Sequence, residues 1–371
     1  MAIDNGAWTV GIEEEYQIID PVTRGLRPRS DWLLPQAQPV LGEDVQPELY
    51  QAQIETTSRV CGTLSEVRAE LVRLRRALLA AAASGGNRIG AAGTHPFSRW
   101  EEQPITPKAR YEGIAREYRQ LADELIIFGC HVHVGLDDRE GAVQVLNRVR
   151  PWLAPLLALT ANSPFWQGQD TGYASYRTEL WSRFPMAGPP HVFSFRAEYD
   201  RLVQALVATG SIEDATKIYW DVRLPERFAT IEFRVTDVCL TVDEAVMVAG
   251  LVRALAQTCY EQALRDDPFP AVRPELLRAA HWRAARFGLD AELIDVAAER
   301  AVRAHTMIET LLTFVQPALE ASGDWDEVAG IVRDTLGRGN GAARQREVYR
   351  RAGRIEDVVD FIVAETAQGL E

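Results

Sequence analysis

Four segments of the chain alternate between apolar and polar residues with a period of two. They are residues 9–18, 51–58, 128–136 and 230–238. In the first segment the even positions are apolar except for Glu14, and the odd positions are polar or glycine. Successive side chains of a β-strand point to opposite faces. The pattern predicts four strands, each with one core face and one polar face, and it places Glu14 at an edge or in solvent.

The polar faces of these strands carry groups that favour a lined cleft over a solvated surface. They hold Glu13 and Glu15, then Gln51, Gln53, Glu55 and Thr57, then His131 and His133, and finally Thr230, Glu232, Arg234 and Thr236. Carboxylates two residues apart on a strand lie about 7 Å apart and repel unless a cation is near. For any one of these strands, a solvent-facing polar surface is as good an explanation as an active site. Four such strands together predict an active site that binds metal.

The ligand types leave two kinds of metal chemistry open. Carboxylate oxygens with an occasional histidine suit Mg²⁺ or Mn²⁺. The His131-x-His133 pair is also compatible with zinc, as in many hydrolases. A metal-dependent hydrolase that needs no nucleotide is therefore an alternative function.

Helical periodicity fills much of the remaining chain. One helix is predicted from Ser65 to Gly85, and another after Asp138, which Pro151 and Pro155 are expected to bend or break. From about Val242 onward the pattern is mainly helical, with helices predicted at 243–264, 291–314, 325–336 and 355–366. Because no linker or repeat interrupts the sequence, we predict a single catalytic domain over residues 1–371, of the α+β class.

Amino-acid composition limits the cellular locations and the binding partners that we expect for this protein. The 371 residues are 47% hydrophobic and 25% charged, as in soluble globular proteins. No apolar run has the length of a membrane span, residues 1–10 lack the features of an export signal, and the four cysteines form no CxxC pair. We therefore expect a cytoplasmic protein without a membrane partner. The net charge of −13 argues against nucleic acid but not against a nucleotide bound through Mg²⁺.

Six segments in sequence order carry a family resemblance. They are GIEEEYQI (11–18), IGAAGTHPF (89–97), FGCHVHVG (128–135), NSPFWQGQDTGYASYR (162–177), IYWDVR (218–223) and TIEFRVTD (230–237). Together they resemble the type 2 glutamate–cysteine ligase family, and most closely its bacterial carboxylate–amine ligase branch. The resemblance spans residues 8–260 and weakens in the helical part that follows.

The resemblance implies a fold and a reaction. The fold is glutamine-synthetase-like: a curved, mainly antiparallel sheet with its active site on the concave face and helices outside. The implied enzyme is an ATP-dependent ligase that forms a C–N bond, with ATP as co-substrate and Mg²⁺ or Mn²⁺ as cofactor. It activates the γ-carboxylate of glutamate as an acyl phosphate and couples it to an amine. The resemblance also implies weak glutamate–cysteine ligase activity. It does not identify the physiological amine, and a homodimer is possible.

The resemblance also implies roles for individual residues. The metal ligands would be Glu13, Glu15, Glu48, Glu55, His131 and Glu232, with Glu48 requiring a bend near Pro47 to reach the same face as Glu55. Arg234 would be catalytic, by stabilising charge on the transferred phosphoryl group. Arg177 and His133 would bind the amino-acid substrate, and Arg223 would bind nucleotide phosphate.

Overall fold

The computed structural model describes residues 8–370. The expectation that residues 1–10 hold no export signal therefore falls mostly outside the described range. Among the helices that are described, none is both long enough and apolar enough to cross a bilayer.

A mainly antiparallel sheet lies at the centre of the molecule. Within residues 8–370 it has seven strands in the order β10-β11-β5-β1-β3-β2, with β4 paired to β1, and each neighbouring pair is antiparallel. The strands are β1 Val10–Ile19, β2 Val45–Pro47, β3 Gln53–Thr57, β4 Arg88–Gly90, β5 Gly129–Gly135, β10 Val222–Arg223 and β11 Thr230–Asp237. Three smaller pairs lie outside it: β6 Phe165–Trp166 with β7 Gln169–Asp170, β8 Ala187–Gly188 with β9 Tyr219–Trp220, and β12 Glu292–Asp295 with β13 Arg300–Arg303.

Helices surround the sheet and form most of the C-terminal part. They are α1 Ser30–Leu41, α2 Leu64–Ser84, α3 Ala109–Tyr118, α4 Gln120–Asp123, α5 Arg139–Thr160, α6 Tyr176–Trp181, α7 Arg196–Ala208, α8 Val242–Leu264, α9 Pro274–Phe287, α10 Ala304–Ser322, α11 Trp325–Arg338, α12 Gly341–Ala352 and α13 Ile355–Thr366. Helices α2 and α8 each begin with a capping box, at Thr63 and Thr241, which satisfies backbone N–H groups of the first turn. Helix α5 is continuous, so neither Pro151 nor Pro155 breaks it.

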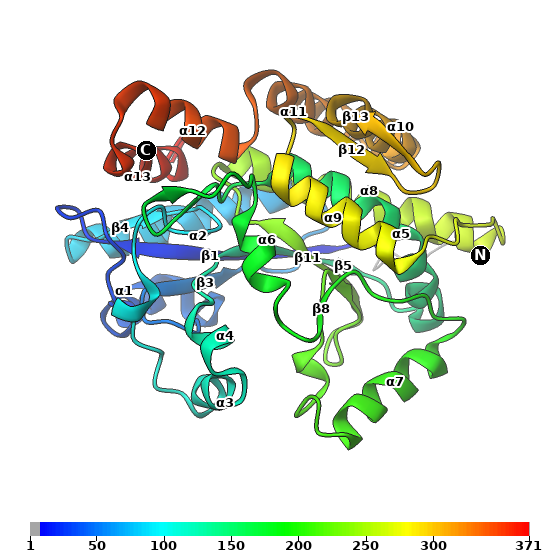
Figure 1. Ribbon diagram of the computed structural model, residues 1–371, viewed down its shortest axis with the longest axis horizontal. Helices are drawn as coiled ribbons and strands as arrows, with labels where there is room; N and C mark the ends of the chain where they lie inside the picture. Colours follow the sequence, from blue (N-terminus) through cyan, green and yellow to red (C-terminus); the bar gives the residue numbers. More distant parts are fainter. Residues whose placement is uncertain (1–7, 371) are drawn as a thin grey trace.

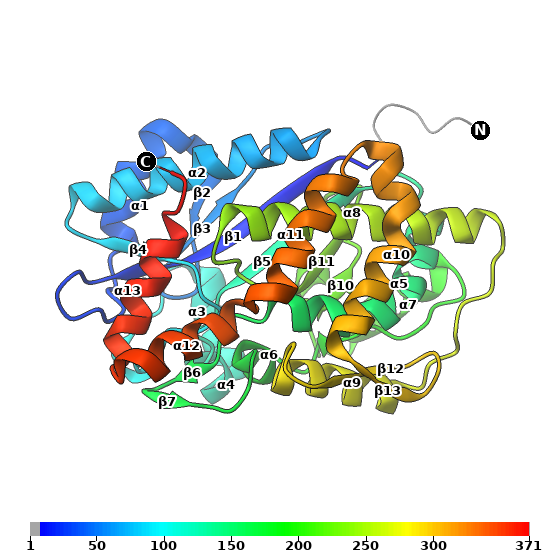
Figure 2. The ribbon, with the colours of Figure 1, turned by 90° about the horizontal axis from the view of Figure 1, so that it is seen from above.

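The helices make one face of the sheet the core. Helices α2, α5 and α8 pack on that face, and α10 and α11 pack on α8 as an outer layer (Figures 1 and 2). The apolar side chains of the central strands enter this layer, among them Ile12, Val132 and Phe233, each about 1% exposed. Helices α3, α4 and α7 lie on the other side of the sheet (Figure 1). The predicted α+β fold, with an antiparallel sheet and helices outside, is confirmed.

Glu14 does not lie in solvent, so that expectation is wrong. It is 1% exposed on the core face, where Arg75 of α2 binds both of its carboxylate oxygens. The same guanidinium donates to the carbonyl oxygens of Cys239 and Leu240, at 2.9 Å each. A buried carboxylate is stable in such a place because its charge is paired and its lone pairs are satisfied. The strand alternation alone contains no sign of this partner.

A register shift in β11 changes the polar face predicted for residues 230–238. Between Phe233 and Thr236 the pairing with β5 shifts, so that Thr236 lies opposite Cys130 and Asp237 opposite Gly129. A bulge of this kind adds a residue to one strand and reverses the alternation after it. Thr236 therefore leaves the predicted polar face, where Asp237 takes its place.

The helix predicted for residues 291–314 begins later than expected. Residues 292–303 form the hairpin of β12 and β13, and α10 starts only at Ala304. In the turn, the Asp295 carboxylate accepts hydrogen bonds from the backbone N–H groups of Ala297 and Ala298, at 3.2 and 3.0 Å. An aspartate that bonds to the backbone two residues on favours a turn over a helix.

Candidate active site

Cross-strand pairing gathers the predicted acidic and histidine side chains on the polar face of the sheet. Glu13 of β1 lies opposite His131 of β5, and Glu15 of β1 lies opposite Glu55 of β3. Directly opposite residues of antiparallel strands point to the same side of a sheet. The pairing therefore explains why side chains from distant segments meet.

One group on this face consists of three carboxylates, which we call the carboxylate trio: Glu15, Glu48 and Glu55. Each offers an oxygen, and these oxygens all lie within 4.8 Å of one another. Strand β2 ends at Pro47, and Glu48 directly follows it, with its carboxylate close to that of Glu55. The Glu48 carboxylate accepts a hydrogen bond from the Leu49 N–H at 2.8 Å, and Glu15 accepts one from the Gly129 N–H at 2.6 Å.

The trio is poorly stabilised in its fully ionised form. Burial, followed by the charge of Glu48, raises the pKa of Glu15 to about 7. Burial also raises the pKa of Glu48, and it raises the pKa of Glu55 well above its usual value, with the charges of Glu13, Glu48 and Glu15 adding to the effect. Like charges brought together in a buried place favour protonation unless a cation neutralises them. Three hard oxygen donors at this spacing fit a divalent cation such as Mg²⁺.

The second group, which we call the paired cluster, consists of Glu13, His131, His133 and Glu232. The Glu13 carboxylate lies 3.2 Å from Nδ1 of His131 and 3.3 Å from Nε2 of His133. His133 Nε2 also lies 4.0 Å from the Glu232 carboxylate. Of these four, Glu13, His133 and Glu232 are close enough to one another to hold a metal ion.

Charges in the paired cluster compensate one another. Burial opposes ionisation of Glu13, but hydrogen bonds from His131 and His133 outweigh it and hold the pKa of Glu13 well below its usual value. Burial likewise opposes ionisation of Glu232, and the charges of Arg234 and Arg223 overcome it, so that the pKa of Glu232 falls to about 2. The two carboxylates of this cluster are therefore ionised at neutral pH.

The two arginines that bind Glu232 differ in how many of their donors are used. Arg223 binds Glu232 through Nε at 2.6 Å and donates to the carbonyl oxygens of Thr216 and Ile218, at 3.0 and 2.8 Å. Arg234 binds Glu232 through one terminal nitrogen, while its buried Nε has no hydrogen-bond partner among the described residues. Arg234 therefore keeps donors for a ligand, whereas Arg223 holds Glu232 in place.

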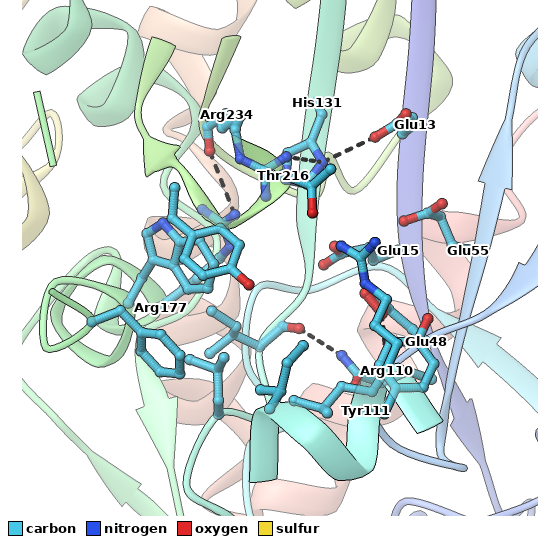
Figure 3. Close-up of a pocket in the computed structure, with 18 of the residues that line it drawn as sticks. Glu13, Glu15, Glu48, Glu55, Arg110, Tyr111, His131, Arg177, Thr216 and Arg234 are labelled. Carbon is cyan, nitrogen blue, oxygen red and sulfur yellow. Dashed lines mark hydrogen bonds and ion pairs between the residues drawn. The ribbon is translucent and has the colours of Figure 1, made fainter. Parts of the chain in front are cut away.

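Both groups border one cavity of about 210 Å³. Figure 3 shows Glu13, Glu15, Glu48 and Glu55 on one side of it and Arg177 and Arg234 on the other. The cavity thus places negative and positive side chains across a space that could hold a small charged substrate.

Arg177 enters the cavity from α6. It is 4% exposed and lies 3.8 Å from the Asp237 carboxylate, while its Nε has no hydrogen-bond partner among residues 8–370. Asp237 is itself held by the hydroxyls of Ser163 and Ser175, at 2.7 and 2.9 Å. Asp237 orients Arg177 and leaves part of the guanidinium available. The sequence did not predict Asp237 as a site residue, because the bulge in β11 shifts it onto the polar face against the alternation.

Several other residues that line the cavity were not predicted from the sequence. They are chiefly Arg110 and Tyr111 of α3, Thr216, and Trp181 of α6. Arg110 is exposed and has no ion pair or hydrogen bond from its side chain among the described residues. These positions come from helices and loops that fold over the sheet, so no periodic pattern marks them.

The structure brings the predicted site residues together, but their roles stay predictions. Glu13, Glu15, Glu48, Glu55, His131, Arg177, Arg223 and Arg234 line the cavity, and Glu232 and His133 adjoin it through the paired cluster. The metal-compatible group contains His133, which was predicted to bind substrate, and not His131, which was predicted to bind metal.

Solved structures with the same fold are ligases. A glutamate–cysteine ligase from Francisella tularensis, in complex with AMP, superposes with a TM-score of 0.70 at 13% identity over 98% of this chain and 89% of that one. A bifunctional glutathione synthetase from Pasteurella multocida gives 0.67 at 14% identity, over 98% of this chain and 53% of that one. The fold is thus shared with glutamate–cysteine ligases.

Sequence similarity identifies the family. Residues 9–361 match the glutamate-cysteine ligase family 2, and the chain belongs to this family. A protein of Frankia alni named "Putative glutamate--cysteine ligase 2-2" is 44% identical over 97% of both chains. A protein of Rhodopirellula baltica named "Putative glutamate--cysteine ligase 2" is 42% identical over 96% of both. The predicted family, and with it the class of ATP-dependent ligases that form a C–N bond, is confirmed.

Proposed function

We propose that this protein uses ATP to activate the γ-carboxylate of glutamate as an acyl phosphate and couples it to an amine. The observation that carries the proposal is the cavity in which the carboxylate trio faces Arg177 and Arg234. Transfer of a phosphoryl group needs a cation site for the phosphates and fixed positive charge near the transferred group. Family membership supports ATP as the second substrate.

The trio fits a divalent cation on the chemistry of its donors. Glu15, Glu48 and Glu55 would hold Mg²⁺ or Mn²⁺, and Glu13, His133 and Glu232 offer a second position. When bound, the cation would neutralise phosphate charge and orient ATP. The pKa values of the trio are raised even though Arg177, Arg234 and Arg110 lie near enough to lower them, which supports a further cation at this place.

The arginines then have separate tasks. Arg234 is held by Glu232 and keeps donors directed to the cavity, so it would stabilise charge on the phosphoryl group during transfer. Arg177, oriented by Asp237, would grip the α-carboxylate of glutamate. Arg223 has its donors engaged by Glu232 and by carbonyl oxygens, so it would act on the site through Glu232 and not by binding the nucleotide.

The proposed reaction has two steps. An oxygen of the γ-carboxylate attacks the γ-phosphorus of ATP, and ADP leaves. The neutral amine then attacks the acyl carbon, the C–O bond to phosphate breaks, and the amine nitrogen loses a proton as the amide forms. Inorganic phosphate therefore retains one oxygen of the original carboxylate. Exclusion of water from the cavity would limit hydrolysis of the acyl phosphate before the amine arrives.

The test is the fate of labelled oxygen. The protein is incubated with Mg-ATP, γ-carboxyl ¹⁸O-glutamate and a panel of amines, with the amide and the phosphate analysed by mass spectrometry. We expect an amide and one ¹⁸O in phosphate for each turnover. The variant Glu232→Gln should lose turnover while keeping a folded circular dichroism spectrum, although its unfolding temperature should fall because Arg223 and Arg234 lose their charged partner. Amide formation without ¹⁸O in phosphate would exclude the acyl phosphate, and hydrolysis that is indifferent to ATP would favour the hydrolase.

A further inference from the structure

A second cavity adjoins the one described above. Its volume is about 870 Å³, and it lies where α9 packs beside α6, with the loop around Gly188 also lining it (Figure 1). Three residues line both cavities: Arg177, Trp181 and Arg234. A molecule in the second cavity would therefore lie next to the place where the carboxylate is activated.

A buried aspartate and a buried histidine meet on the wall of this second cavity. Asp221 lies between β9 and β10, His281 lies on α9, and they are 6% and 7% exposed. Oδ2 of Asp221 and Nε2 of His281 lie 2.9 Å apart, and neither atom has another partner among the described residues. Nδ1 of His281 donates a hydrogen bond to the carbonyl oxygen of Leu277 at 3.2 Å. Because a carbonyl oxygen only accepts, Nδ1 carries the proton of the neutral ring, and Nε2 can take up another.

The backbone fixes Asp221 beside Arg234. The N–H group of Arg234 donates to the carbonyl oxygen of Asp221 at 2.7 Å, and the N–H group of Asp221 donates to the carbonyl oxygen of Gly188 at 2.9 Å. The second carboxylate oxygen of Asp221, Oδ1, has no hydrogen-bond partner among residues 8–370, and unlike Oδ2 it is not fully buried. Asp221 thus offers one oxygen to the cavity and turns the other towards His281.

Amide formation needs a group of this kind. An alkylamine is an ammonium ion at neutral pH and cannot attack the acyl phosphate until it loses a proton. A second proton leaves the nitrogen as the amide forms, and the departing phosphate can take that one. The carboxylates of the first cavity are already engaged, by arginine and histidine in the paired cluster and by the proposed cation in the trio. The first proton therefore requires another acceptor.

We propose that Asp221 and His281 form the proton relay that converts the ammonium group of the amine substrate into the neutral amine. The inference rests on the proposed ligase function, for which it names the proton acceptor. An N–H bond of the ammonium group breaks as Oδ1 of Asp221 takes the proton. The carboxyl group then passes the proton to Nε2 of His281, which leaves a carboxylate beside an imidazolium ion. Arg177 and Arg234 favour this transfer, because positive charge nearby disfavours the ammonium form.

The test compares methylamine with hydroxylamine, two amines of similar size. Methylamine is protonated at neutral pH, whereas hydroxylamine is largely neutral and has no ammonium proton to lose. The methylamide and the hydroxamate formed from glutamate and Mg-ATP are measured by mass spectrometry. In Asp221→Asn we expect kcat/KM for methylamine to fall about 10²-fold, the lower range of general acid–base catalysis, while kcat/KM for hydroxylamine stays close to wild type. The hydroxylamine rate reports on folding and on carboxylate activation in the same variant.

Two further variants test the parts of the relay. His281→Gln can still donate a hydrogen bond to Asp221 but cannot accept its proton. It should therefore slow the reaction of methylamine alone, chiefly through kcat. Glu179→Gln removes another carboxylate from the same cavity, on α6 and partly buried, and should keep both rates.

The possible results are distinct. Equal losses with both amines in Asp221→Asn would assign the Asp221–His281 pair a structural role and would overturn the inference, as would an unchanged methylamine rate. A selective loss of methylamine turnover in Glu179→Gln would overturn it by placing the acceptor on α6. Hydroxamate without any methylamide from the wild type would also contradict the relay. If the wild type forms neither product, the proposed ligase function itself fails.

Discussion

The carboxylate trio and the paired cluster are neighbours on one sheet, but their ionised carboxylates are stabilised to opposite degrees. In the paired cluster, arginine and histidine partners hold the pKa values of Glu13 and Glu232 below their usual range. In the trio, burial and mutual repulsion raise the pKa values of Glu15, Glu48 and Glu55. The first arrangement is complete within the chain. In the second, the carboxylates carry uncompensated charge when ionised, and we propose that a bound cation would offset it.

The largest expected effect comes from removing Arg234, the cation bound to Glu232 of the paired cluster. Arg234→Met should lower kcat about 10³-fold, because a fixed positive charge near the transferred phosphoryl group is lost. Steady-state phosphate release with saturating ATP and glutamate measures this. Since Arg234 is not a metal ligand, added Mg²⁺ should not restore the rate. If high Mg²⁺ restored the rate of Arg234→Met, the result would show that Arg234 and the carboxylate trio serve the same function.

The next effect concerns the trio. Glu55→Gln should weaken the apparent affinity for Mg²⁺ at least about 100-fold, because losing a group that merely supports a metal ligand already costs up to that much. Turnover measured as a function of Mg²⁺ concentration should then recover at high Mg²⁺, unlike that of Arg234→Met. Glu14→Gln provides a comparison on the opposite face of the sheet, in the neighbouring strand β1, where Arg75 binds the carboxylate. An unchanged Mg²⁺ dependence in Glu55→Gln would remove the trio from the metal site.

The two groups should also give opposite dependences of stability on pH. Glu15 has a folded-state pKa of about 7, above its unfolded value, so its contribution is present at low pH and is lost as pH rises towards 7. The lowered pKa of Glu232, about 2, gives a contribution that is lost only as pH falls towards 2. Between pH 5 and 8 the metal-free protein should therefore lose a few degrees of unfolding temperature.

Thermal unfolding in EDTA and in Mg²⁺ across this range measures the difference. The stabilisation by Mg²⁺ should increase with pH, because deprotonated carboxylates are the ligands. Glu15→Gln should flatten the EDTA curve. A curve in EDTA that rises from pH 5 to 8 with the same slope in Glu15→Gln would contradict the account of the trio.

The smallest effect is expected at the rim. Arg110 is exposed beside the trio and has no partner for its side chain among the described residues, so it is placed to contact a phosphate. Arg110→Ala should raise KM for ATP about 5-fold and leave kcat nearly unchanged, in line with an exposed ion pair of about 1 kcal/mol. Arg116→Ala, on the same helix but outside the cavity lining, is the matched control. Equal effects of both variants would assign the change to the helix as a whole.

Strand alternation predicted the part of the site that regular pairing controls. Glu13, Glu15, Glu55, His131 and His133 share a face because their strands pair in register, and an alternation of period two is visible in the sequence. The antiparallel fold and the helical C-terminal part followed from the same patterns and from the family resemblance. In these segments local pattern and tertiary structure agree.

The remaining features depend on contacts that a local pattern does not contain. The partner of Glu14 comes from α2, and the bulge in β11 exchanges Thr236 for Asp237 on the site face. Arg110 reaches the cavity from a helix that folds over the sheet. The 292–303 hairpin has apolar residues, such as Leu293, at spacings that also suit a helix, so periodicity did not distinguish the two.

The most direct test of the central claim is a crystal structure of the protein with Mn²⁺ and an ATP analogue, with data collected at the manganese absorption edge. Our account predicts an anomalous peak coordinated by Glu15, Glu48 and Glu55. No peak among these carboxylates at saturating Mn²⁺, with the analogue bound in the cavity, would contradict it.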